Sequence, residues 1–147
     1  MKIAIASDHA GLELKTELVR VLVEKGHQAQ DFGTHNGDSV DYPDFAVKVS
    51  RAVASGEYTF GVLVCGTGIG MSIVANKHRG VRAALCSTEF EARMARAHND
   101  ANVLCLGQRT VGAGVGRAIL EAFLATSFEG GRHAKRVQKI HDAESAG

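Results

Sequence analysis

One stretch of the sequence constrains the fold more than any other. An unbroken apolar run ends at Cys65, and glycines follow it at positions 66, 68 and 70. A segment with apolar residues at helical spacing then starts at Ile69. This pattern predicts a buried strand, a tight turn and the start of a helix. Glycine lets the backbone approach a ligand closely, and the first N–H groups of a helix favour a phosphate or an anionic intermediate.

The same stretch has a second interpretation. The glycine spacing matches neither the dinucleotide-binding fingerprint nor a P-loop, and a tight turn can use glycine for packing alone. A lone cysteine such as Cys65 is more often a small buried hydrophobe than a base. The stretch therefore predicts either a ligand-binding turn or a tight turn that uses glycine only for packing.

Apolar runs and helical segments alternate along the whole chain. Continuous apolar strands are typical of a parallel sheet that is covered by helices on both faces. The expected strands are 2–7, 28–32, 60–64, 81–86 and 103–106, and the expected helices are 14–25, 43–53, 69–77, 89–97, 111–126 and 133–143. We therefore predict one doubly wound α/β domain over residues 1–147, with a five-stranded parallel sheet whose order begins 2-1-3.

That strand order brings two distant polar groups together. Asp8 and His9 follow the first strand, and Cys65 ends the third, so both carboxyl ends meet at the point where the strand order reverses. This convergence predicts a binding crevice. Asp8 could equally cap the helix that follows it, and His9 could be a solvated loop residue or a donor to an anion.

The charge and cysteine content exclude several classes of protein. The net charge is +1 over 147 residues, which gives no electrostatic reason to expect nucleic-acid or membrane binding. The first residues gain charge too quickly for a signal peptide, and no apolar run is long enough to span a bilayer. The three cysteines lack metal-binding spacing. We expect a reduced, metal-free cytoplasmic protein.

Basic residues later in the chain are also candidates. His98 follows the predicted helix 89–97, where it could serve only to complement the helix dipole. Arg132 and Arg136 are four residues apart and share one face if their segment is helical, as phosphate binding requires, although a solvated basic face is an alternative. Arg109, just after the last predicted strand, has the same two interpretations.

Together these motifs resemble a known family, the type B ribose-5-phosphate isomerases, whose relatives include galactose-6-phosphate and allose-6-phosphate isomerases. The resemblance covers Lys2 to about Ile140. The motifs that carry it are Ser7-Asp8-His9-Ala10-Gly11, Asp41-Tyr42-Pro43, Cys65-Gly66-Thr67-Gly68-Ile69-Gly70, Ala75-Asn76-Lys77, His98-Asn99-Asp100 and Glu129-Gly130-Gly131-Arg132-His133.

The resemblance implies a cofactor-independent isomerase that interconverts D-ribose 5-phosphate and D-ribulose 5-phosphate through an enediolate. It implies a Rossmann-like fold and homodimers, or dimers of dimers, whose active sites are shared between subunits. The helix at 133–143 would then pack on a partner. Some relatives use a glutamate after the glycine turn as the base, but Met71-Ser72 here has none, so the resemblance assigns Cys65 to that role.

The resemblance also assigns the other site residues. His98 of the partner subunit would assist ring opening with Thr67 nearby, and Asp8 would move protons at the sugar oxygens. The residues implied in substrate binding are Asp8, His9, Tyr42, Gly66, Thr67, Gly68, Ile69, Gly70, Asn99, Arg109, Arg132 and Arg136.

Two alternatives stay open at this point. A hexose-6-phosphate isomerase would share the mechanism and differ in the length of its pocket. A non-catalytic sugar-phosphate binding module would share the phosphate contacts and have no turnover. A dehydrogenase is disfavoured, because the first strand–helix turn lacks the glycine fingerprint.

Overall fold

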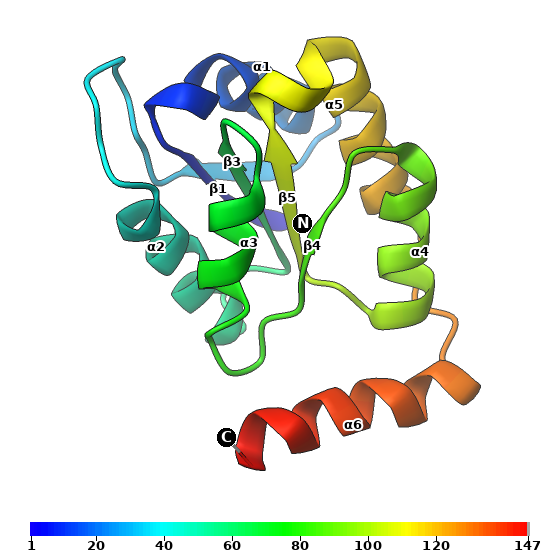
Figure 1. Cartoon of the computed structure of the whole chain (residues 1–147). Helices are drawn as coiled ribbons and strands as arrows, with labels where there is room; N and C mark the ends of the chain where they lie inside the picture. The colour runs from blue at the N-terminus through cyan, green and yellow to red at the C-terminus, as the bar shows by residue number, and fades with distance from the viewer. Residues whose placement is uncertain (147) are drawn as a thin grey trace.

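A parallel sheet forms the centre of the molecule (Figure 1). The computed structural model describes residues 1–146, and Gly147, the last residue of the predicted domain, lies outside the described residues. Within residues 1–146 the sheet has five strands in the order β2-β1-β3-β5-β4, and every pairing is parallel. The predicted α/β fold and the strand order beginning 2-1-3 are confirmed.

The elements follow one another in a regular βα alternation. In chain order they are β1 (Lys2–Ser7), a 3-10 turn η1 (His9–Gly11), α1 (Leu12–Glu24), β2 (Gln28–Asp31), α2 (Tyr42–Ala54), β3 (Phe60–Cys65), α3 (Ile69–Ala75), β4 (Ala83–Leu85), α4 (Glu89–Asn99), β5 (Val103–Gly107), α5 (Gln108–Ala125) and α6 (Arg132–Ala146). None of the helices in this described range is long and apolar enough to cross a membrane.

Helices cover both faces of the sheet because successive strand side chains point to opposite sides. On β1, Ile3 and Ile5 pack in one core with side chains of α1, α4 and α5. Ala4 and Ala6, between and after them, pack in a second core with side chains of α2 and α3. The doubly wound arrangement therefore follows from the continuous apolar runs.

Two helix boundaries differ from the prediction at places that matter for the site. α4 continues past Ala97 to Asn99 and ends where Asp100 adopts a left-handed conformation, at φ 47° and ψ 42°. His98 thus lies in the last helical turn and not after it. α5 starts at Gln108 and not at Val111, but Gly112 breaks its helical geometry with φ 71° and ψ 174°.

A contact between residues seven positions apart explains why α3 ends earlier and β4 starts later than predicted. α3 ends at Ala75, before Lys77, and the side-chain amide of Asn76 then donates to the Ala83 carbonyl at 3.0 Å and accepts from the Ala83 N–H at 2.8 Å. This clamp fixes the start of β4 at Ala83, and no local periodicity encodes it. β2 is likewise one residue shorter than predicted.

α6 stands apart from the other helices. It runs from Arg132 to Ala146, which is longer than the predicted 133–143, and its buried residues are His133 and Val137. In Figure 1 it lies beyond one end of the sheet, next to the end of α4.

Candidate active site

The turn after β3 holds Cys65 at its inner end. The Cys65 sulfur accepts a hydrogen bond from the Gly68 N–H at 3.1 Å, and the residue is 5% exposed. Gly68 adopts φ +77°, and a Cβ placed on it would lie 2.6 Å from Leu85 Cδ1 and 3.0 Å from the Leu106 carbonyl oxygen. Only glycine fits this turn, so the turn positions both the sulfur and the N–H that contacts it.

Asp8 lies beside this turn on the neighbouring strand. The last paired residues of β1 and β3 are Ser7 and Val64, so Asp8 is level with Cys65. The Asp8 N–H still donates to the Val64 carbonyl at 3.3 Å. Its Oδ1 accepts from the N–H groups of Ala10 and Gly11 at 3.0 and 3.1 Å. Asp8 therefore caps the 3-10 turn η1 and not α1, whose N-cap residue Gly11 receives no side-chain hydrogen bond. This cap fixes the Asp8 carboxylate next to the glycine turn.

Three further predicted residues surround this position. Nδ1 of His9 accepts from the Val40 N–H at 3.1 Å, so the neutral ring carries its proton on Nε2 and can donate from there. The Tyr42 ring packs on Gly70, where an added Cβ would meet it at 2.4 Å. The Arg109 N–H donates to the Gly66 carbonyl at 2.9 Å.

Thr67 and Ile69 form the outer rim of the turn. Both are exposed, and the Ile69 N–H donates to the Thr67 hydroxyl oxygen at 3.3 Å. The edge of the sheet formed by the carboxyl ends of the strands, called the carboxyl edge below, thus collects Asp8, His9, Tyr42, residues 66–70 and Arg109.

The other predicted residues lie at the opposite edge, which is formed by the amino ends of the strands. α4 follows β4 and leads into β5, so it runs back from the carboxyl ends of the strands to their starts, a span of roughly 16 Å for eleven residues. His98 and Asn99 are at its far end, and Arg132 and Arg136 are exposed on the first turns of α6. One chain therefore does not bring these four residues to Cys65.

His98 has two close neighbours at that edge. Its ring stacks on His133, with centroids 4.2 Å apart, and its Nε2 lies 4.0 Å from Glu129 Oε1. Burial, and next the charge of His98, lowers the pKa of His133. Together the three residues offer ligand atoms that a metal ion could use.

Arg96 supports the turn that follows His98, and the sequence interpretation overlooked it. Its guanidinium is mostly buried and donates to Asp100 Oδ1 at 2.9 Å and to the Ala101 carbonyl at 2.7 Å. It also lies over the Phe60 ring at 4.7 Å. The signal that could have found it is an arginine four residues before an aspartate on an otherwise apolar helix face.

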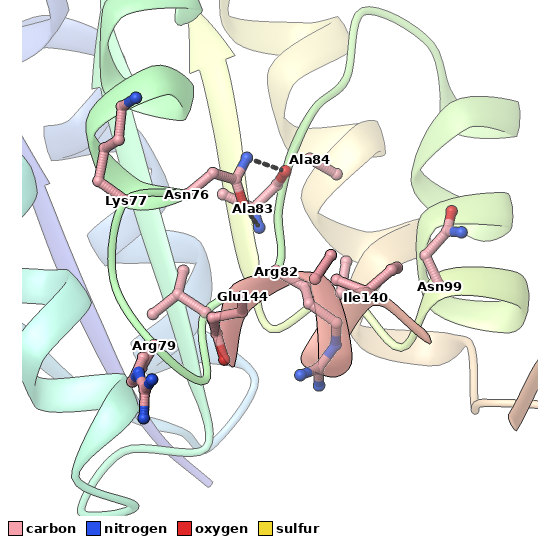
Figure 2. A pocket seen from close by; sticks show the side chains of 12 residues that line it. Asn76, Lys77, Arg79, Arg82, Ala83, Ala84, Asn99, Ile140 and Glu144 are labelled. Carbon is pink, nitrogen blue, oxygen red and sulfur yellow. Dashed lines mark hydrogen bonds between the residues drawn. The ribbon is translucent and has the colours of Figure 1, made fainter. Parts of the chain in front are cut away.

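Asn99 lines a groove between α6 and the body of the domain (Figure 2). The groove has a volume of about 900 Å³. Basic side chains border it, among them Lys77, Arg79 and Arg82, and Glu144 of α6 accepts from the Gly80 N–H at 3.0 Å. It is remote from Cys65 and so does not form part of the same crevice.

The two other cysteines are in the core, as the sequence suggested, and Cys65 is itself buried at the end of the core that α2 and α3 cover. Burial, with a smaller contribution from Glu91, raises the pKa of Cys86 to about 12. Burial also raises the pKa of Cys105, which is wholly enclosed. Of the three thiols, Cys65 alone lies at the glycine turn.

Comparison with known proteins identifies the family to which this arrangement belongs. A family model described as Ribose/Galactose Isomerase matches residues 3–140. The chain belongs to the ribose/galactose isomerase family.

Members of that family are similar along their whole length. Ribose-5-phosphate isomerase B of Escherichia coli is 48% identical over 139 residues, which cover 95% of this chain and 93% of that protein. The solved structure of Clostridium thermocellum ribose-5-phosphate isomerase B has a TM-score of 0.98 and 52% identity, and 99% of each chain is covered. The type B enzyme of Trypanosoma cruzi gives a TM-score of 0.97 at 45% identity, with both chains covered in full.

Proposed function

We propose that this protein interconverts D-ribose 5-phosphate and D-ribulose 5-phosphate through an enediolate, with Cys65 as the base. Membership of the family and the similarity to type B ribose-5-phosphate isomerases support the substrate and the reaction. The observation that carries the mechanism is the position of the Cys65 sulfur at the end of β3. The sulfur accepts a hydrogen bond from the Gly68 N–H, and Cys65 is level with Asp8, which directly follows β1.

The first chemical step moves a proton from carbon. The Cys65 thiolate takes the proton from C2 of the open-chain aldose, and the C2–H electron pair forms the C1–C2 double bond while the C1 carbonyl oxygen becomes negative. N–H groups of the turn 66–70 stabilise that oxygen; one well-placed donor of this kind is worth about 3–4 kcal/mol. Individual N–H groups do this work, because α3 has only seven residues.

The second step completes the hydrogen transfer. Asp8 relays the proton of the C2 hydroxyl to O1, and the protonated Cys65 returns its proton to C1, which leaves a ketone at C2. No electrons leave the sugar, so the reaction needs no redox cofactor. The relay requires the carboxylate of Asp8 to stay beside the turn, where the N–H groups of Ala10 and Gly11 hold it.

The phosphate is proposed to bind farther from the reacting carbons. His9 donates from Nε2, and Arg109, which is anchored to Gly66 through its N–H, supplies a guanidinium from the same chain. Arg132 and Arg136, with Asn99 for the sugar, would come from a second subunit. Binding energy at the phosphate then positions C1 and C2.

A homodimer with shared sites, or a dimer of dimers, follows from this division. β4 is an edge strand whose outer side is unpaired within residues 1–146, and exposed apolar side chains lie around it. They are Ile69, Ile73, Leu85 and Phe90, which are 36–62% exposed. Packing of a partner there, and of α6 on that partner, would bring His98 to Cys65 of the other chain.

The remaining parts of the proposal concern the whole chain. Residues 1–147 act as one sugar-phosphate isomerase domain, which fits the single sheet that both cores share. The protein is proposed to work in the cytoplasm, since its three cysteines are free and none pairs with another.

Rates on three substrates test the proposed activity. We expect turnover of ribose 5-phosphate to exceed that of allose 6-phosphate and galactose 6-phosphate at equal concentration. A higher rate on either hexose phosphate would reassign the substrate within the family. Negligible turnover of all three, with ligand binding retained, would support a non-catalytic binding module instead.

Substitution of single cysteines tests the base. Cys65→Ala should lower kcat by about 10²–10⁴-fold, the usual contribution of a positioned acid or base, while binding of the substrate persists. Cys86→Ala is the matched control, because Cys86 is buried in the core on one face of the sheet, whereas Cys65 belongs to the core on the other face. Equal losses in the two variants would reject Cys65 as the base.

A further inference from the structure

Three side chains from two separate segments meet at the end of α4, and the proposed reaction uses only one of them. His98 and His133 stack with their ring planes 11° from parallel. Glu129 Oε1 lies 4.0 Å from His98 Nε2 and 3.6 Å from His133 Nε2. One ligand atom from each residue lies within 4.8 Å of the other two. Two imidazoles and a carboxylate therefore face one small volume.

We propose that His98, Glu129 and His133 bind a divalent first-row transition ion of the Zn²⁺ type. Two imidazole nitrogens and one carboxylate oxygen form a known zinc ligand set, in which water or a substrate oxygen takes the fourth position. Imidazole nitrogen favours zinc, nickel, cobalt and copper, whereas magnesium and calcium favour sites made of oxygen alone. The ligand types thus define the class of ion.

The backbone already holds two of the ligands at nearly the required spacing. Ligand atoms about 2.0–2.2 Å from a tetrahedral zinc lie roughly 3.3 Å from one another. Glu129 and His133 are close to this, and their segment is anchored where the Glu129 N–H donates to the Ala97 carbonyl at 3.0 Å. The His133 N–H donates to the Gly130 carbonyl, also at 3.0 Å.

Only the third ligand has to move. The two imidazole rings are nearly parallel. The His98 ring must therefore rotate within its plane before its Nε2 points to the ion position that Glu129 and His133 define. Its side chain is 37% exposed and has room to do so, whereas the His133 side chain is 8% exposed and stays in place. Glu129 supplies a negative charge that attracts the ion. The exposed Arg132, next to His133, repels it, so we expect the bound ion to exchange with solution.

The consequence for activity rests on the proposed function. His98 is the residue proposed to open the sugar ring in the partner's site, and a metal-bound Nε2 has no lone pair or proton left for that task. The ion would therefore inhibit the isomerase and not assist it. The bound ion would be removed by a chelator, with activity restored.

Titration of the full chain with Zn²⁺ and Co²⁺ tests the site without using turnover. After treatment with a chelator, we expect one ion per chain by calorimetry, and Co²⁺ should give the intense visible absorption of a four-coordinate site. Glu129→Gln and His133→Gln each change a direct ligand, so each should weaken binding at least as much as loss of a hydrogen-bond partner of a ligand does, which is about 10–100-fold. His141→Gln, on the same helix but outside the cluster, should leave the affinity unchanged.

The outcomes separate the site from the proposed function. Equal Zn²⁺ affinity in the original chain and in Glu129→Gln would overturn the metal site; because Glu129 is 56% exposed, that variant should fold. Inhibition by Zn²⁺ that Glu129→Gln relieves would support it, and inhibition that persists unchanged in Glu129→Gln would count against it. A protein that binds the ion but turns over no sugar phosphate would support the site and reject the proposed function.

Discussion

The two edges of the sheet contribute to the proposed reaction by different means. At the carboxyl edge, Cys65 and Asp8 are held by backbone N–H groups of the glycine turn and of η1. At the opposite edge, His98 and Arg132 project from helix ends, and their neighbours are side chains or solvent. The first edge is prepared within one chain, whereas the second presents charged groups outward. This difference is the reason for the proposal that the second edge serves the site of a partner subunit.

The largest expected effect tests whether the two edges belong to one site across two subunits. Cys65→Ala and His98→Ala should each keep no more than about 1% of the original activity alone. A mixture after subunit exchange should regain about a quarter of the original activity, because half of the dimers are hybrids and each hybrid holds one intact site of two. The measurement is the isomerase rate before and after exchange.

The control for that mixture is two portions of the same variant treated alike. Absence of recovery, with exchange verified by mass-tagged subunits, would mean that His98 and Cys65 act within one chain or not together. Such a result would remove the main conclusion drawn from the comparison of the two edges.

The next effect concerns the arginines of the second edge. Arg132→Ala and Arg136→Ala should each raise KM for the sugar phosphate about 10–100-fold, since one charge-assisted hydrogen bond is worth about 1.5–3 kcal/mol. Both side chains are exposed, so the free energy of unfolding should hardly change. Lys139→Ala, exposed on the same helix, is the charge-matched control and should leave KM unchanged. A loss in kcat alone would contradict a role in phosphate binding.

The sequence was most informative where local pattern and topology coincide. The continuous apolar runs predicted the parallel sheet, and the predicted order 2-1-3 brought Asp8 and Cys65 to one crevice, as the register of β1 and β3 confirms. The glycine turn was equally visible in the spacing of Gly66, Gly68 and Gly70. The structure shows why Gly68 is needed there, since its φ is positive and an added Cβ would lie 3.0 Å from the Leu106 carbonyl oxygen.

What the sequence did not predict depends on specific side-chain contacts that hydrophobic periodicity does not encode. The end of α3 and the start of β4 are set by the amide of Asn76 on Ala83. The grouping of His98 with His133 depends on where α6 packs, and nothing in the periodicity of α6 encodes that position. The spacing of Glu129 and His133, four residues apart, was a signal that the interpretation by family motifs passed over.

A smaller effect is expected on stability, and it compares Gly68, which the turn requires, with Gly26, whose position needs only a positive φ. Gly68→Ala should lower the free energy of unfolding by about 1–3 kcal/mol, from backbone strain and from the contact with Leu106, and should also lower kcat, because it moves the N–H that contacts the sulfur. Gly26→Ala shares the strain at φ +84° but meets nothing within 4 Å. Urea denaturation and kcat measured on both variants make the comparison.

Two results would weaken this account of the carboxyl edge. If Gly26→Ala lost as much stability as Gly68→Ala, strain alone would explain the effect and the packing contact would contribute nothing. If Gly68→Ala kept its kcat, the hydrogen bond to the Cys65 sulfur would be irrelevant to the reaction.

The smallest expected effect is a ranking of the three thiols by alkylation rate in the folded protein. Cys86, with a pKa of about 12, has only about one thiolate in ten thousand molecules at pH 8, and burial likewise raises the pKa of Cys105 and keeps it protonated. Unfolding removes the burial that raises the pKa of Cys86 and Cys105. Both thiols should therefore react with the alkylating reagent once the protein is denatured. Iodoacetamide should therefore label Cys65 first, and ribose 5-phosphate should slow that labelling. Mass spectrometry of peptides measures the extent of labelling at each cysteine. Labelling of Cys86 at the same rate as Cys65 would show that the glycine turn gives its thiol no special access, and the chemical distinction between the strand end and the core would then have to be abandoned.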